Sequence, residues 1–233
     1  MPEQPTIPTE HLLAQALEIA GQFPKAALVM DVDETLGNGF EKYWKIISRL
    51  IKQNHPKLTL PTHEHALEVH DIKSAFPKEL ASEIKTIMDK LRNHRISVRN
   101  LALMHPKLAS ILTQVRDQGH PVAMYLTTRP DSLAELTAIE LQRNAFPTAP
   151  IIARPALVDS SQTTPWKLSV LKDFAEKSPH GIIMVDDSIT LNAAITEAGL
   201  PNLNSILIVG PITPANSSAI TWDQFTDHLQ TFA

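Results

Sequence analysis

Cysteine is absent from this 233-residue sequence, so disulfide bonds and thiolate metal sites are excluded. The absence also fits a reducing compartment, and the first ten residues lack the basic and apolar regions of a secretory signal. No apolar run reaches the length of about 18 residues that a membrane span needs. We therefore expect a cytoplasmic protein without a membrane partner.

An excess of positive charge is missing as well. Lys and Arg number 21 against 25 Asp and Glu, which gives a net charge of -4. A general nucleic-acid binder is normally basic, so this balance weighs against nucleic acid as a partner without excluding a local basic patch. The 43% hydrophobic and 20% charged residues are ordinary for a globular protein. The length fits one domain with a sizeable insertion, or two small domains.

Short apolar runs alternate with helical stretches along most of the chain. Apolar runs cover residues 26–33, 122–128, 149–153, 181–187 and 205–210. Helical patterns cover residues 9–21, 106–118, 131–143, 165–177 and 189–198. Nearly continuous apolar runs are typical of strands buried on both faces of a parallel sheet. We predict an α/β fold with a doubly wound (Rossmann-like) parallel sheet of five strands, and with its chemistry at the carboxyl ends of the strands.

One long stretch breaks this alternation. Residues 40–54 and 77–94 carry apolar side chains at helical spacing, and no buried apolar strand lies between them. We predict a helical cap inserted between the first and second strands, with Gly37-Asn38-Gly39 as its hinge, because two of only seven glycines fall there. The predicted domains are a cap at 38–104 and a core at 1–37 plus 105–233.

Two aspartates at the end of the first apolar run are the strongest candidates for chemistry. Asp31 and Asp33 are spaced i, i+2, which turns both side chains the same way in an extended backbone. Two carboxylates held close together raise the pKa of one of them unless a cation neutralises them. The pair suits a divalent metal, Mg2+ above all, and a division of roles between attack and proton transfer. The alternative is a pair of acids that caps the next turn.

Four motifs in order resemble those of the haloacid dehalogenase-like (HAD) superfamily of phosphohydrolases. The first is Asp31-Val32-Asp33-Glu34-Thr35, the second Leu126-Thr127-Thr128-Arg129-Pro130, the third Lys167, and the fourth Val185-Asp186-Asp187-Ser188. The first, second and fourth motifs lie at the ends of predicted strands and the third in a predicted helix, and the resemblance covers about 26–36 and 105–210. The ordered set is more specific than any single motif.

The resemblance implies a role for each of these residues. Asp31 would attack phosphorus and become an aspartyl-phosphate, and Asp33 would act as the general acid and base. Mg2+ would lie between the Asp31 carboxylate, the Asp33 backbone carbonyl and Asp186, with Asp187 supporting the metal shell. The residues left for binding the phosphate are Thr127, Thr128 and Lys167.

Several of these side chains have simpler interpretations. Lys167 could be a solvated lysine in the first turn of a helix, although a cation fits the helix dipole poorly there, and Lys172 is the fallback for its role. Thr127 could serve only the strand or the start of the next helix. Arg129 could reach a substrate anion or pair with Asp131, and the sequence does not decide between them.

The cap would select the substrate by closing over the site and excluding water. Asn38 and Trp44 are our candidates for substrate contact. The alternative for Trp44, as for Phe40 and Tyr43, is the core of the first cap helix.

The sequence as a whole indicates a phosphomonoesterase that acts on a phosphorylated small molecule. Dehalogenation is set aside because superfamily dehalogenases lack the second aspartate, here Asp33. Two alternatives stay open. The segment 125–167 loosely resembles the phosphatase domains of polynucleotide kinase-phosphatases, which suggests a nucleic-acid end (3′-) phosphatase or a nucleotidase; a non-catalytic binding module could also keep this fold. We expect a monomer or a homodimer, since a cap can form a dimer surface.

Overall fold

The central sheet has five parallel strands. A computed structural model describes residues 9–68, 72–94, 102–211, 213 and 217–232. The strands are β1 (Ala27–Met30), β4 (Val122–Pro130), β5 (Ile151–Arg154), β6 (Ile182–Asp186) and β7 (Leu203–Leu207). They lie in the order β5-β4-β1-β6-β7, and every neighbouring pair is parallel. The predicted doubly wound α/β fold is therefore confirmed.

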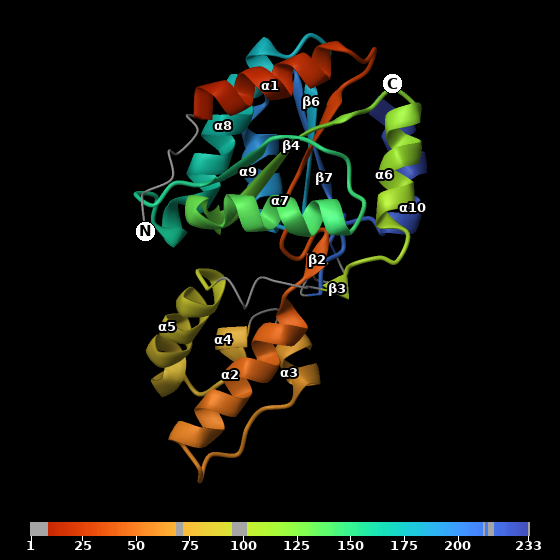
Figure 1. Ribbon diagram of the computed structural model, residues 1–233. Coiled ribbons are helices and arrows are strands. Elements are labelled where there is room, and N and C mark those ends of the chain that lie inside the picture. The colour runs from red at the N-terminus through yellow and green to blue at the C-terminus, as the bar shows by residue number, and fades with distance from the viewer. Residues whose placement is uncertain (1–8, 69–71, 95–101, 212, 214–216, 233) are drawn as a thin grey trace.

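Helices cover both faces of this sheet (Figure 1). One layer holds α1 (Thr9–Gly21), α8 (Thr163–Lys177) and α9 (Ile189–Ala198), and the other holds α6 (Leu108–Asp117), α10 (Trp222–Leu229) and the end of α7 (Ala134–Arg143). All residues of β1 and β6 are buried between the layers, as apolar strands of a covered parallel sheet must be. No helix in the described part of the chain is long and apolar enough to cross a membrane.

The strand order reverses around β1, and this reversal positions the site. From β1 the chain crosses to β4 and β5 on one side, then returns to β6 and β7 on the other. The carboxyl ends of β4, β1 and β6 therefore lie side by side at one edge of the sheet. Ligands bind at this kind of switch point in open α/β sheets.

A helical insertion is attached to the sheet through two short strands (Figure 1). Strands β2 (Gly37–Asn38) and β3 (Ala102–Leu103) pair antiparallel. Between them lie α2 (Phe40–Asn54), α3 (His63–Glu68), α4 (Ile72–Ala75) and α5 (Ala81–Arg92). These helices enclose a hydrophobic cluster of their own, in which Ile47, Ile51 and Ile84 are fully buried. The predicted helical cap is thus present, separate from the sheet in its packing.

One helix of the core was not predicted. Helix α10 begins after Thr221, which exchanges capping hydrogen bonds with Gln224. The spacing of a threonine and a glutamine three residues later is the sequence signal for such a start. The indole Nε1 of Trp222 donates to the carbonyl of Thr35 at 3.2 Å. Helix α10 therefore supports the turn that follows β1.

Phe174 offers a direct test of the packing of α8 against the sheet. Its side chain is fully buried in the cluster formed with α1 and α9. Phe174→Ala should lower the free energy of unfolding by about 3–5 kcal/mol, because it removes buried apolar surface and leaves a cavity. Urea unfolding followed by circular dichroism measures this loss. Leu157→Ala is the control, since Leu157 is 99% exposed and its loss should change stability by less than about 0.5 kcal/mol.

Candidate active site

Polar side chains from three neighbouring strands meet at the carboxyl edge of the sheet. Asp31 directly follows β1, Thr127 and Arg129 lie at the end of β4, and Asp186 ends β6. All four are buried, although the sheet around them is apolar. Buried polar groups are stable only when they are paired, so their partners define what the site can do.

Lys167 links two of these strands. The lysine comes from the first turns of α8, and its Nζ donates to Asp31 Oδ1 at 2.6 Å and to Asp186 Oδ2 at 2.8 Å. Burial disfavours the charged lysine, but the charges of Asp186 and Asp31 outweigh it and raise the pKa of Lys167. Lys167 is therefore a buried cation held between two acids.

The acids outnumber this one cation. Asp31, Asp186 and Asp187 can each offer a carboxylate oxygen, and these oxygens lie within 4.8 Å of one another. Burial raises the pKa of Asp31 well above its usual value, and Asp186 and Asp187 raise it further against the opposing effect of Lys167. Burial, with the charges of Asp186 and Glu34, raises the pKa of Asp187 to about 8. Clustered carboxylates with excess negative charge fit a divalent cation such as Mg2+, which prefers oxygen ligands.

Asp187 is held from two sides. The Thr35 hydroxyl accepts a hydrogen bond from the Asp187 backbone N–H at 3.1 Å and donates to its Oδ1 at 3.3 Å. On the other side, a Cβ at Gly210 would lie only 3.0 Å from the Asp187 Cβ and 3.1 Å from its Oδ2. Thr35 belongs to the first motif but had no predicted role there, and Gly210 was not among the predicted site residues.

Asp33 has a different partner from Asp31. Arg129 binds it through Nε, at 3.1 Å from Oδ1 and 2.9 Å from Oδ2, and through Nη2, at 2.8 Å from Oδ1. The side chain of Asp33 therefore does not belong to the three-carboxylate cluster. The structure also gives Arg129 a partner that the sequence did not suggest, since we had weighed only a substrate anion and Asp131.

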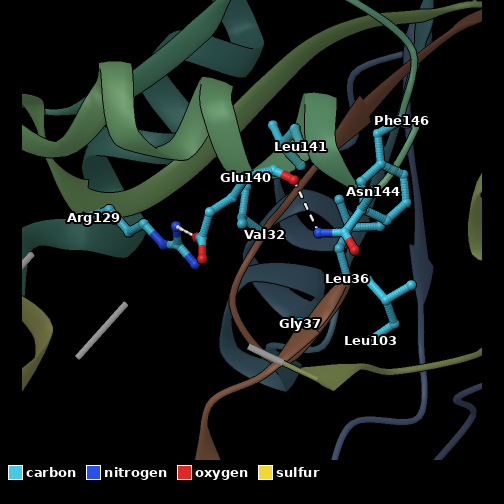
Figure 2. Close-up of a pocket in the computed structure, with 9 residues that line it drawn as sticks. All are labelled: Val32, Leu36, Gly37, Leu103, Arg129, Glu140, Leu141, Asn144 and Phe146. Atoms are coloured by element: carbon cyan, nitrogen blue, oxygen red, sulfur yellow. Dashed lines mark hydrogen bonds and ion pairs between the residues drawn. The ribbon is translucent and has the colours of Figure 1, made fainter. Parts of the chain in front are cut away.

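Arg129 is fixed from behind by α7. Its Nη1 donates to Glu140 Oε2 at 2.9 Å and to the Thr137 hydroxyl at 3.2 Å. Figure 2 shows the guanidinium and the Glu140 carboxylate meeting below this helix. Burial opposes the charged form of Arg129, but Asp33 and Glu140 outweigh that effect and raise its pKa. Sequence reasoning missed Thr137 and Glu140, because nothing in the chain marks a helix residue that faces a strand end.

The cap reaches this part of the site through α2. Lys42 lies within electrostatic range of Glu140 and Arg129. Its pKa is lowered, mainly because the side chain is partly buried, and the charge of Arg129 adds to this effect while Glu140 opposes it. The first helix of the cap therefore stands beside the Asp33–Arg129 pair.

The remaining predicted residues lie in varied surroundings. The Thr127 hydroxyl accepts from the Arg129 backbone N–H at 3.2 Å, whereas the Thr128 side chain is exposed. Asn38 Oδ1 accepts from the Glu41 backbone N–H at 3.3 Å, near the start of α2. Trp44 is buried in the cap, with its ring beside His63 and Phe76. Lys172 is exposed on α8. Substrate contact by these residues stays a prediction.

No protein-family model and no curated protein matches this sequence. Several solved structures do match the fold of this chain. A haloacid dehalogenase-like family hydrolase of Streptococcus pneumoniae gives a TM-score of 0.57 at 15% identity, covering 90% of this chain and 99% of that one. The chain has the fold of HAD-like hydrolases. Protein tyrosine kinase A of Mycobacterium tuberculosis gives the same TM-score, identity and coverages. A Haemophilus somnus protein described as a predicted phosphoglycolate phosphatase gives 0.54 at 17% identity, covering 90% and 98%.

These neighbours match the chain over most of its length. Each covers nearly all of both chains, so the cap as well as the sheet lies within the matched length. Identities of 15–17% support a common fold and leave the activity to be argued from the site itself. The HAD-like fold that the motifs resembled is therefore confirmed.

Asp187→Asn tests whether the three carboxylates share a cation. Because the folded-state pKa of Asp187 is raised to about 8, the metal-free protein should lose stability as the pH rises from about 4 to about 8. Above that range the metal-free variant should melt higher than the wild type, by about 2–4 °C for each kcal/mol gained. Added MgCl2 should raise the Tm of the wild type and leave that of the variant nearly unchanged. Thermal melts on both sides of pH 8 measure these effects, and equal Mg2+ shifts in the two proteins would contradict the shared site.

Gly210→Ala tests the close approach behind Asp187. The new methyl group should push the Asp187 carboxylate away from its partners, because its distance of 3.0 Å from the Asp187 Cβ is shorter than an ordinary contact. We expect Mg2+ affinity to fall by about 10–100-fold, as for other changes that displace a metal ligand. Isothermal titration calorimetry with MgCl2 measures this loss. Gly21→Ala is the matched control, since a Cβ at Gly21 would have nothing within 4 Å and should leave the affinity unchanged.

Proposed function

We propose that this protein is a Mg2+-dependent phosphomonoesterase that hydrolyses a phosphorylated small molecule through an aspartyl-phosphate on Asp31. The observation that carries the proposal is the buried contact of Lys167 with Asp31 and Asp186, beside the three-carboxylate cluster. The fold alone does not decide the reaction, because one neighbour is named a protein tyrosine kinase. The arrangement of charges supports phosphoryl transfer specifically.

Asp31 is the nucleophile in this proposal. One of its oxygens is held by Lys167, which fixes the direction of the carboxylate and leaves a cation close to the phosphoryl oxygens. Catalysis of phosphoryl transfer depends almost entirely on such positioning and on neutralising negative charge. When Asp31 attacks, the bond between phosphorus and the ester oxygen breaks, and the phosphoryl group passes to the aspartate.

Asp31, Asp186 and Asp187 would hold the Mg2+ ion. When bound, the ion supplies positive charge next to the phosphoryl group. Lys167 and the ion would then neutralise the acids that are in excess without them. This division of charge accounts for a cluster of three carboxylates in which, among the residues that the structure describes, Lys167 is the one lysine in direct contact, through Asp31 and Asp186.

Asp33 handles the protons. It gives one proton to the leaving ester oxygen, which departs as an alcohol. It then takes one proton from the water that attacks the aspartyl-phosphate, so that inorganic phosphate leaves and Asp31 is regenerated. Asp33 comes from the same turn as Asp31 but has a separate partner, Arg129, which supports a separate role. A general acid or base of this kind contributes about 10²–10⁴-fold to the rate.

The position of the cap favours a small molecule as the substrate. Helix α2 brings Lys42 near Arg129 and Glu140, so the helical insertion lies over one side of the site. A cap that covers the reacting group leaves less room for an extended ligand, and the net charge of -4 does not attract a nucleic acid. Phosphorylated metabolites therefore fit this site better than a polymer end.

Hydrolysis of p-nitrophenyl phosphate by the purified protein tests the proposal. Turnover should require added MgCl2 and disappear with EDTA. Asp31→Asn should lower kcat by at least about 10³-fold, because the amide removes the nucleophile while keeping its shape. Asp173→Asn, on the exposed side of α8, is the matched control and should keep wild-type kcat. Activity that survives equally in Asp31→Asn would contradict the assigned nucleophile.

A further inference from the structure

We propose that Arg129 and Glu140 are positioning residues for Asp33. Glu140 holds the guanidinium of Arg129, and Arg129 holds the Asp33 carboxylate in the orientation from which it transfers a proton to the leaving group. This inference rests on the proposed function, because it takes Asp33 as the general acid and base. It gives a role to Arg129, which the second motif contains without explaining, and to Glu140, which lies outside all four motifs.

The contacts at Asp33 fix the plane of its carboxylate. Oδ1 accepts two bonds from Arg129, at 2.8 and 3.1 Å, whereas Oδ2 accepts one, at 2.9 Å. A carboxylate has about four acceptor positions, so Oδ2 keeps more capacity to carry a proton. A guanidinium is planar and forms parallel bonds to both oxygens, which a lysine cannot reproduce.

The guanidinium is itself immobilised. Nη1 is bound by Glu140 at 2.9 Å and by the Thr137 hydroxyl at 3.2 Å, and that hydroxyl donates in turn to the Leu133 carbonyl at 3.0 Å. The backbone N–H of Arg129 is fixed as well, by the Thr127 hydroxyl. Every bond to Asp33 described above therefore comes from a group whose position is set by β4 and α7.

The exposure of the three charged groups shows which of them faces the site. The side chain of Arg129 is 3% exposed and that of Glu140 12%, whereas that of Asp33 is 20% exposed. The two supporting groups are thus the more deeply buried, and the acid is the group that water or a ligand reaches. Buried ion pairs contribute little net stability, so stability alone does not account for two acids on one buried arginine. Orientation of Asp33, the most exposed of the three groups, does account for them.

The fall in rate caused by losing this orientation should depend on the leaving group. A displaced acid slows the departure of a basic leaving group, which needs a proton, more than that of a weakly basic one. Phenyl phosphate and p-nitrophenyl phosphate have nearly the same shape, but phenol is the more basic leaving group. A merely structural role for Arg129 or Glu140 would lower the turnover of both esters equally.

The test measures kcat/KM of Glu140→Gln and Arg129→Lys with both esters. This constant reports the steps up to leaving-group departure, so it contains the transfer of the first proton. We expect phenyl phosphate to lose about tenfold or more, and p-nitrophenyl phosphate less than about threefold. Glu135→Gln, at an exposed position on the same helix, is the matched control and should retain wild-type values. Equal losses for the two esters would overturn the inference while leaving the proposed function intact.

A second measurement separates positioning from direct contact with the substrate. If Arg129 and Glu140 act only through Asp33, then Glu140→Gln and Arg129→Lys should cost less than about twofold in an Asp33→Asn background. Losses as large as those in the wild-type background would overturn the inference. Circular dichroism checks folding, and Glu140→Gln carries the test if Arg129→Lys does not fold. A wild-type protein that turns over neither ester would remove the proposed function, and the inference with it.

Discussion

The rest of the site depends on one interaction, the buried contact of the Lys167 ammonium group with Asp31 and Asp186. It joins the ends of β1 and β6 through a residue of α8, so three elements are fixed relative to one another by one side chain. Removing a single partner from such a buried ion pair costs about 3–5 kcal/mol, because a charge is left without compensation. The same contact that closes this edge of the sheet also fixes the direction of the Asp31 carboxylate, the proposed nucleophile.

The reversal of strand order at β1 explains why these groups can meet at all. Side chains that are far apart in the sequence follow neighbouring strands, with Asp31 between the ends of β4 and β6. Helix α10 supports the turn after β1 from outside, through the bond from Trp222 to Thr35. Thr35 in turn binds Asp187. Helix α10 is thus connected to the carboxylate cluster through two successive contacts, made by the buried side chains of Trp222 and Thr35.

The part of this arrangement that could be predicted is the part encoded by local patterns. Apolar runs and helical periodicity located the five strands, the helices of the core and the two long cap helices, because burial on one or both faces leaves a period in the sequence. The four motifs placed the carboxylates at strand ends. Helix α10 was missed although Thr221 and Gln224 carry its start signal, since only a short apolar pattern follows them.

Contacts between distant residues could not be predicted in the same way. The pairing of Arg129 with Asp33 depends on how far β4 extends past β1, and the register between these strands leaves no trace in either segment. Glu140 reaches Arg129 only because α7 brings its side chain to the end of β4. Asn38 and Trp44 were chosen from their position near the hinge, and the structure places the Trp44 ring inside the cap cluster.

The proposed mechanism requires a covalent phosphoryl group on Asp31. Borohydride reduces an aspartyl-phosphate to homoserine, which marks the residue that carried the phosphoryl group. The protein is incubated with p-nitrophenyl phosphate and MgCl2, and the reaction is quenched with borohydride. The protein is then digested, and its peptides are sequenced by mass spectrometry. We expect homoserine at position 31, dependent on both substrate and Mg2+. Homoserine at another position, or sustained turnover with position 31 unmodified, would contradict the proposed mechanism.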